Sequence, residues 1–190
     1  MERAVITIVS GLPRSGTSMM MKMLEAGGMQ LLTDGIRTAD EDNPKGYYEF
    51  ERVKQIEDDK EWLEDARGKA VKMIAALLKH LPPEYRYEVV FLRRNIGEVL
   101  ASQRRMLVRR GEPTETVPDE RMAELFTKHV EQVETWIAEQ PNMTVIYVDH
   151  GDVLDDAARQ ARRVSEFLTC TLDVQAMAAV VDRSLYRQRQ

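Results

Sequence analysis

Residues 5–18 read VITIVSGLPRSGTS and carry the strongest structural signal in the chain. The run from Val5 to Val9 is rich in β-branched residues, which favour a strand buried on both faces. A helix is expected to follow from Thr17 to Ala26, and Gly27-Gly28 marks its end. A glycine-bearing turn between a buried strand and a helix N-terminus presents backbone N–H groups that can bind phosphate.

Strand and helix patterns alternate along the rest of the chain, which is typical of an α/β fold. We therefore predict a three-layer P-loop fold, with a mostly parallel sheet and helices on both faces, as one domain over residues 1–190. A long loop is expected from Met29 to Gly46. The remaining predicted strands are Ala70 to Ile74, Glu88 to Arg93 and Thr144 to Val148. The remaining predicted helices are a surface helix from Tyr48 to Ala66, one capped by Asn95 and Glu98 and ended by Gly111, one from Met122 to Ile137, and one from Ala157 to Leu168.

Composition excludes several classes of function. The 190 residues contain 27 Lys and Arg against 32 Asp and Glu, and this net charge of −5 argues against a broad nucleic-acid surface. No apolar run approaches the roughly 20 residues needed to cross a bilayer. The single cysteine, Cys170, can form neither an internal disulfide nor a CxxC metal site, so a cytoplasmic location is the default.

The segment from Gly11 to Ser18 departs from the nucleotide-triphosphatase loop at one position. Both glycines and the final serine are present, but Thr17 stands where that pattern has its lysine. ATP would lack its usual partner there, so a different anion is expected, and Arg14 could supply a cation from another direction. The strand ending in Arg93-Arg94 also lacks an acidic residue for Mg²⁺, although Asp149 leaves a Mg²⁺-dependent kinase open.

Several segments together resemble the sulfotransferase family, which transfers a sulfuryl group from 3′-phosphoadenosine 5′-phosphosulfate (PAPS) to a hydroxyl or amine. Pro13 to Thr17 look like the family's 5′-phosphosulfate loop, and Arg94 with Ser102 is similar to its 3′-phosphate pair. Val148 to Leu154 and Phe167-Leu168 resemble two further family segments. The resemblance implies PAPS as co-substrate without a metal, a small-molecule acceptor, and a cofactor site formed by Pro13, Arg14, Ser15, Gly16, Thr17, Ser18, Arg94 and Ser102.

The C-terminal end lacks the RKG motif that completes the 3′-phosphate site in the animal cytosolic members of this family. The arginines between Asp182 and Arg187 could replace it, so Arg187 is a candidate cofactor-binding residue. A solvated tail is the equally simple interpretation.

Four side chains are candidates for the chemistry itself. Glu49 ends a segment similar to the NPxGYxE stretch of bacterial members and is the first choice for the base that takes the acceptor's proton. His80, within Lys79-His80-Leu81-Pro82, resembles the histidine of the animal enzymes and is the second. Lys72, placed at the end of its strand, matches the family's catalytic lysine and could protonate or polarise the leaving phosphate oxygen. Arg14 could stabilise the same leaving phosphate.

Each of these residues also has an ordinary structural interpretation. Glu49 could simply favour a helix start, His80 could end a turn, and Lys72 could be an exposed lysine on an edge strand. His129 and His150 have no predicted role. A small-molecule kinase and a non-catalytic nucleotide-binding protein remain the competing functions, and neither the acceptor nor the oligomeric state follows from the sequence.

Overall fold

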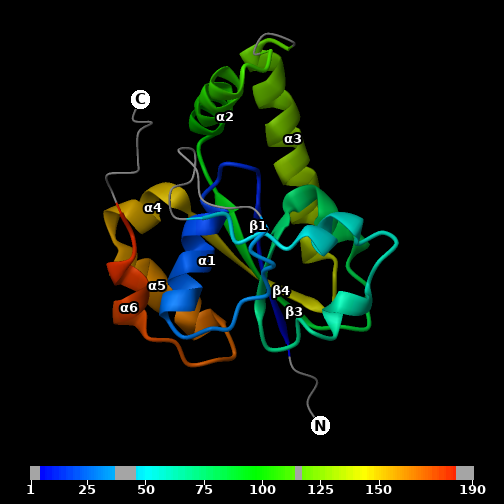
Figure 1. Cartoon of the computed structure of the whole chain (residues 1–190), viewed down its shortest axis with the longest axis vertical. Coiled ribbons are helices and arrows are strands. Elements are labelled where there is room, and N and C mark those ends of the chain that lie inside the picture. Colours follow the sequence, from blue (N-terminus) through cyan, green and yellow to red (C-terminus); the bar gives the residue numbers. More distant parts are fainter. Residues whose placement is uncertain (1–4, 37–45, 114–116, 183–190) are drawn as a thin grey trace.

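The computed structural model describes residues 5–36, 46–113 and 117–182, and in them the strands form one parallel sheet (Figure 1). Its strand order is β2-β1-β3-β4, so β1 lies between β2 and β3. All three pairings are parallel, and the carboxyl ends of the strands therefore meet at one edge. The strands are β1 (Ile6–Gly11), β2 (Ala70–Ile74), β3 (Tyr87–Arg93) and β4 (Met143–Asp149).

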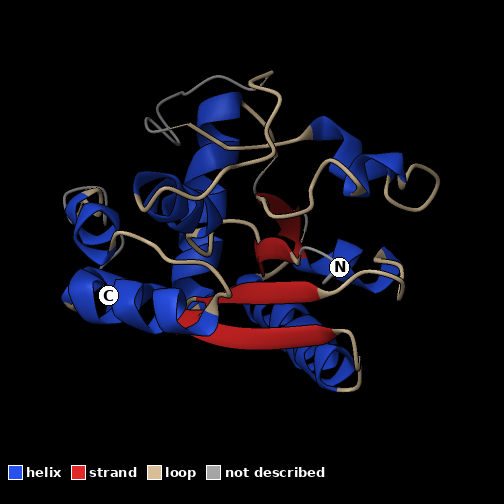
Figure 2. Ribbon diagram, turned by 90° about the horizontal axis from the view of Figure 1, so that it is seen from below, coloured by secondary structure: helices blue, strands red, loops and turns tan. Residues whose placement is uncertain are grey.

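Helices lie on both sides of the strands (Figures 1 and 2). Side chains alternate along β1. Ile6 and Ile8 therefore belong to the hydrophobic core on one face of the sheet, and Val9 belongs to the hydrophobic core on the other face. The predicted α/β fold with a parallel sheet is confirmed. The α-helices are α1 (Thr17–Ala26), α2 (Ile96–Arg110), α3 (Asp119–Ala138), α4 (His150–Asp155), α5 (Ala157–Phe167) and α6 (Val174–Ala179), with short 3-10 helices η1 (Glu51–Gln55), η2 (Glu61–Leu63) and η3 (Ala75–His80).

The elements around the phosphate loop follow the predicted boundaries closely. Helix α1 begins and ends where the sequence indicated, and β2 has the predicted limits. Helix α2 begins at the predicted cap, where the Asn95 side chain accepts a hydrogen bond from the Glu98 N–H at 3.2 Å. It ends at Gly111, whose φ of 67° is the left-handed conformation that glycine adopts without strain.

The predicted surface helix from Tyr48 to Ala66 is wrong. The structure has η1 and η2 there, joined by turns, and most of the apolar side chains at the predicted spacing are buried in the core. Arg52 makes two hydrogen bonds to Asp59 at 2.7 and 2.8 Å, and the Trp62 indole donates to the Asp59 carbonyl at 3.1 Å. These contacts stabilise the turn between η1 and η2, and apolar positions three residues apart suit a 3-10 helix as well as an α-helix.

Helices α2 and α3 extend beyond the carboxyl edge of the sheet, as Figure 1 shows. Of the predicted apolar face of α3, only Ile137 is buried, while Val130 and Val133 pack at the margin of the core. Leu125, nearer the start of the helix, remains 44% exposed. Within the described ranges, none of the helices is long and apolar enough to cross a membrane.

Candidate active site

The phosphate loop depends on two glycines whose hydrogen atoms face other parts of the chain. Gly11 has φ 149°, and a Cβ there would lie 2.6 Å from the Leu92 carbonyl oxygen. Gly16 has φ 100°, and its Cβ would lie 2.6 Å from Cδ2 of His150. Larger residues would be strained at both positions and would push the loop away from β3 and α4. The close approach therefore fixes where α1 begins.

The loop offers hydrogen-bond donors that fit an anion. The N–H groups in the first turn of α1 have no acceptor within the helix, as at any helix start, and they carry its partial positive charge. The Ser15 hydroxyl is buried and has no hydrogen-bond partner among the described residues. Its Oγ lies 2.6 Å from where a Cβ on Gly11 would stand, so it faces the start of the loop and not its open side. The N–H groups at the start of α1 therefore suit an anion such as a phosphate or sulfate group.

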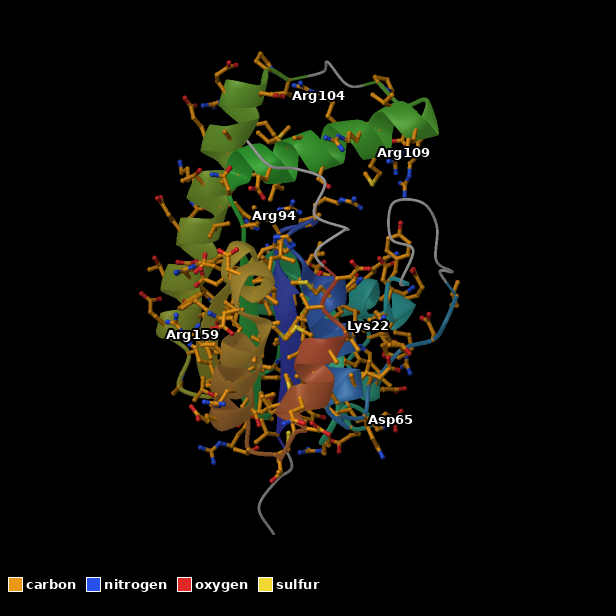
Figure 3. All side chains as sticks on the ribbon, turned by 90° about the vertical axis from the view of Figure 1, so that its left-hand side faces the viewer. Lys22, Asp65, Arg94, Arg104, Arg109 and Arg159 are labelled. Atoms are coloured by element: carbon orange, nitrogen blue, oxygen red, sulfur yellow. The ribbon has the colours of Figure 1, made fainter. Side chains whose placement is uncertain are left out.

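The predicted 3′-phosphate pair lies against this loop. Arg94 follows β3, and its guanidinium donates to the Arg14 carbonyl oxygen at 3.0 Å and to Glu98 at 3.0 Å. Ser102 is buried on α2, where its Oγ accepts a hydrogen bond from Nε of Arg14 at 2.9 Å. Figure 3 shows Arg94 between the sheet and α2. Arg14 thus joins two sets of residues that the sequence suggested for opposite ends of the nucleotide.

The neighbouring arginine serves a different purpose. Arg93 makes two hydrogen bonds of 2.7 Å to Glu134 on α3, and its guanidinium lies 3.9 Å from the centre of the Tyr147 ring. The hydrogen-bonded Glu134 carboxylate raises the pKa of Arg93. Arg93 therefore attaches α3 to the sheet, while Arg94 faces the phosphate loop.

On the other side of the loop, a lysine and a carboxylate meet. Lys72 lies within β2 and not at its end as predicted, and its long side chain reaches the start of α1. Its Nζ donates to the Tyr47 carbonyl oxygen and to the Ser18 Oγ, the latter at 3.4 Å, and lies 3.6 Å from the Glu49 carboxylate. The two charged side chains are only 13% and 19% exposed, so their attraction is weakly screened.

The other predicted residues lie elsewhere or outside the described chain. His80 ends η3 with its Nε2 3.0 Å from Glu57, and the structure does not bring it to the phosphate loop. Asp149 is exposed and pairs in register with Arg93. Arg187 lies outside the described residues. In the part of the chain that is described, no three His, Cys, Asp or Glu side chains are grouped as a metal site requires.

Sequence reasoning missed His150. It is the first residue of α4, it is 8% exposed, and its ring packs against Gly16 of the phosphate loop. Burial and the positive charge of Arg94 lower its pKa to about 4, although Glu98 acts in the opposite direction. The available signal was its position after β4, because side chains at the carboxyl ends of parallel strands converge.

Comparison with known proteins identifies a family and a fold. The family model described as "Sulfotransferase domain" matches residues 6–190. The fold is similar to that of the sulfotransferase domain from the curacin biosynthetic pathway, with TM-score 0.56 and 14% identity over 96% of this chain and 89% of that chain.

Two further solved structures share this fold. The sulfotransferase STF1 from Mycobacterium tuberculosis gives TM-score 0.62 and 15% identity over 94% of this chain and 71% of that one. Mouse sulfotransferase SULT7A1, complexed with PAP, gives TM-score 0.58 and 18% identity over 96% and 63%. No curated protein sequence matches this chain.

Proposed function

This chain belongs to the sulfotransferase domain family, and we propose that it transfers a sulfuryl group from PAPS to a hydroxyl or amine of a small molecule. The observation that carries the proposal is the contact between the phosphate loop and the Arg94–Ser102 pair, made through Arg14. Two adjacent anion-binding sets suit a nucleotide with phosphate at both its 5′ and its 3′ positions. A nucleoside triphosphate needs only the first set.

The arrangement divides the chemistry among a few residues. PAPS supplies the sulfuryl group: its sulfur bonds to the acceptor oxygen or nitrogen while the bond to the 5′-phosphate oxygen breaks. Loop N–H groups with Ser15 and Ser18 hold the phosphosulfate, and Lys72 stabilises the charge that develops on the leaving phosphate. Glu49 accepts the acceptor's proton. Thr17 suffices where ATP enzymes have lysine, because a sulfuryl group carries less charge than a γ-phosphoryl group.

The composition of the chain also indicates the setting of the reaction. Residues 1–190 act as one catalytic domain in the cytoplasm, without nucleic acid and without a metal ion. The net charge of −5 and the single cysteine support this setting.

Thermal unfolding with added nucleotides tests the proposal. Adenosine 3′,5′-bisphosphate should raise the unfolding temperature, and EDTA should leave the rise unchanged. At 100 times the dissociation constant, ligand binding stabilises the folded state by about 2.7 kcal/mol, which such a scan detects easily. ATP with Mg²⁺ is the comparison ligand. Stabilisation by ATP with Mg²⁺ alone would identify a kinase instead.

A further inference from the structure

The residue before Glu49 has an unusual backbone conformation. Tyr48 has φ 53°, in the left-handed region that a bulky residue rarely adopts and that persists only where surrounding contacts hold it. It stands between two residues that both contact Nζ of Lys72: the Tyr47 carbonyl oxygen accepts a hydrogen bond from it, and the Glu49 carboxylate lies 3.6 Å away. The turn at Tyr48 therefore lets the carbonyl before it and the carboxylate after it meet the same ammonium group.

The contacts that hold Tyr48 come from α1. Its ring packs against the hydrophobic core that contains the buried side of this helix. Its hydroxyl donates to Oε2 of Glu25, in the last turn of α1, at 3.1 Å. At the other end of the helix, the Ser18 hydroxyl donates to the Tyr47 carbonyl oxygen at 3.3 Å. The segment is thus attached along about two turns of the helix that begins at the phosphate loop.

The phenol is a permanent donor in this position. Burial, followed by the hydrogen bond to Glu25 and its negative charge, raises the pKa of Tyr48 to about 12. The hydroxyl therefore keeps its proton near neutral pH, and the bond to Glu25 persists there.

The main chain after Glu49 is held by different contacts. The Asp34 N–H donates to the Glu49 carbonyl oxygen at 3.2 Å, and the Asp34 carboxylate accepts from the Glu51 N–H at 2.5 Å. Glu49 is therefore fixed from both directions, by Asp34 on the far side and by Tyr48 on the near side. A base needs such support, because displacement by about 1 Å from the proton that it accepts lowers the rate sharply.

We propose that Tyr48 is a positioning residue, which holds the Glu49 carboxylate beside Lys72 through its left-handed backbone and its hydrogen bond to Glu25. The inference rests on the proposed function, in which Glu49 is the base. In the NPxGYxE segment that Glu49 ends, Tyr48 stands at the variable position, so the resemblance assigns it no role. Tyr48 acts only through Glu49.

A double-mutant cycle on kcat tests this dependence, with any acceptor that the wild-type protein sulfates. Tyr48→Phe removes only the hydroxyl and should lower kcat by about 5- to 10-fold, while the affinity for adenosine 3′,5′-bisphosphate stays unchanged. In a Glu49→Gln background the same change should lower kcat no further, because the base that it positions is already absent. A general loss of structure would instead lower kcat by the same factor in both backgrounds.

Two variants of Glu25 and one distant tyrosine complete the set. Glu25→Ala should reproduce Tyr48→Phe, whereas Glu25→Gln keeps a carbonyl acceptor and should restore most of the wild-type kcat. Tyr85→Phe is the matched control, since the Tyr85 phenol also donates to a glutamate, Glu64, at 2.6 Å. Tyr85 precedes β3, at the opposite edge of the sheet from the phosphate loop, so kcat should not change.

Hydrogen exchange in the protein without nucleotide gives a second readout. Tyr48→Phe should speed amide exchange in residues 46–51 and leave residues 17–26 as in wild type, because the segment loses an attachment and α1 does not.

Other results would overturn the inference. Wild-type kcat in Tyr48→Phe, equal losses in both backgrounds, or unchanged exchange in residues 46–51 would each do so and leave sulfuryl transfer intact. Wild-type kcat in Glu49→Gln would remove the base and this inference with it. Wild-type protein that neither binds the bisphosphate nor sulfates an acceptor would overturn the proposed function itself.

Discussion

The two sides of the phosphate loop carry the same kinds of residue in different arrangements. On the β2 side, Lys72 and Glu49 lie 3.6 Å apart, a cation beside a carboxylate. On the β3 side, Arg94 contacts Glu98 and the Arg14 carbonyl oxygen, and Arg14 donates to the Ser102 hydroxyl, so two guanidinium groups and a hydroxyl lie together beside one carboxylate. A cation beside a proton acceptor suits catalysis, whereas converging donors suit the binding of a phosphate dianion. We infer that the β2 side performs the transfer and the β3 side holds the nucleotide.

The difference has a topological origin. Strand β2 is at the edge of the sheet, and its Lys72 side chain reaches the start of α1. The segment from Tyr47 to Glu49 contacts the same lysine. Strand β3 is interior, so functional groups on its side come from the residues after it and from α2. If this division is correct, variants on the β2 side change turnover and variants on the β3 side change nucleotide affinity.

The largest effect is expected at Lys72. Lys72→Ala should lower kcat by about 10²- to 10³-fold, because it removes a donor to the charge on the leaving phosphate. Steady-state kinetics with any acceptor that the wild-type protein sulfates would measure this loss. Lys79→Ala, an exposed lysine on η3, should leave kcat unchanged. If Lys72→Ala weakens the bisphosphate but spares kcat, the division between the two sides fails.

Glu49 should come next. Glu49→Gln should lower kcat by roughly 10²-fold, the usual contribution of a positioned base, and retain affinity for the bisphosphate. His80→Asn is the matched comparison and should be nearly silent, since His80 contacts Glu57. An inactive His80→Asn beside an active Glu49→Gln would assign the base to His80.

A smaller, selective effect is expected on the β3 side. Arg94→Ala should weaken adenosine 3′,5′-bisphosphate by about 10- to 100-fold and adenosine 5′-monophosphate much less, because a charged hydrogen bond is lost. Ser102→Ala removes a neutral hydroxyl and should cost about 5-fold. Calorimetric titration of both nucleotides measures the selectivity. Equal losses for the two nucleotides would mean that Arg94 supports the loop and does not bind the 3′ group.

The smallest effect concerns pH and His150. Because its folded pKa of about 4 lies below the ordinary value of 6.5, the unfolded chain binds more protons between these values. The stability that His150 contributes is complete above about pH 6.5 and is lost as pH falls. Between pH 7 and 5.5, wild type should lose about 1 kcal/mol more unfolding free energy than His150→Gln in urea titrations. Identical losses in both proteins would show that His150 is not buried in its neutral form.

Local signals predicted some elements well and failed for others. The boundaries of α1, the cap of α2 and the buried strands follow from adjacent residues: β-branched runs, Asn95 with Glu98, and glycines that end helices. The segment from Tyr48 to Ala66 was mispredicted as a surface helix because its apolar spacing also suits 3-10 turns. Contacts within the segment, such as the hydrogen bonds from Arg52 to Asp59 seven positions later, stabilise the turn that the spacing did not predict.

The candidate site shows the same limit. The sequence alone showed Gly11 and Gly16, the threonine in place of lysine, and the spacing between Arg94 and Ser102. The direction of the Arg14 side chain was not, because it depends on a hydrogen bond to a residue 88 positions away. The contact between His150 and Gly16 was equally hidden.

The sequence by itself determined the four strands, the helices α1, α2, α3 and α5, and the kind of loop after β1, because these depend on residues close together along the backbone. Only the tertiary structure decided which charges meet: Lys72 with Glu49, Arg94 with the loop and Arg93 with α3. Neighbouring residues on a strand face opposite sides of the sheet, and the order of the strands decides which elements each side chain meets. Partner choice is therefore a property of the packed sheet, which no local pattern encodes.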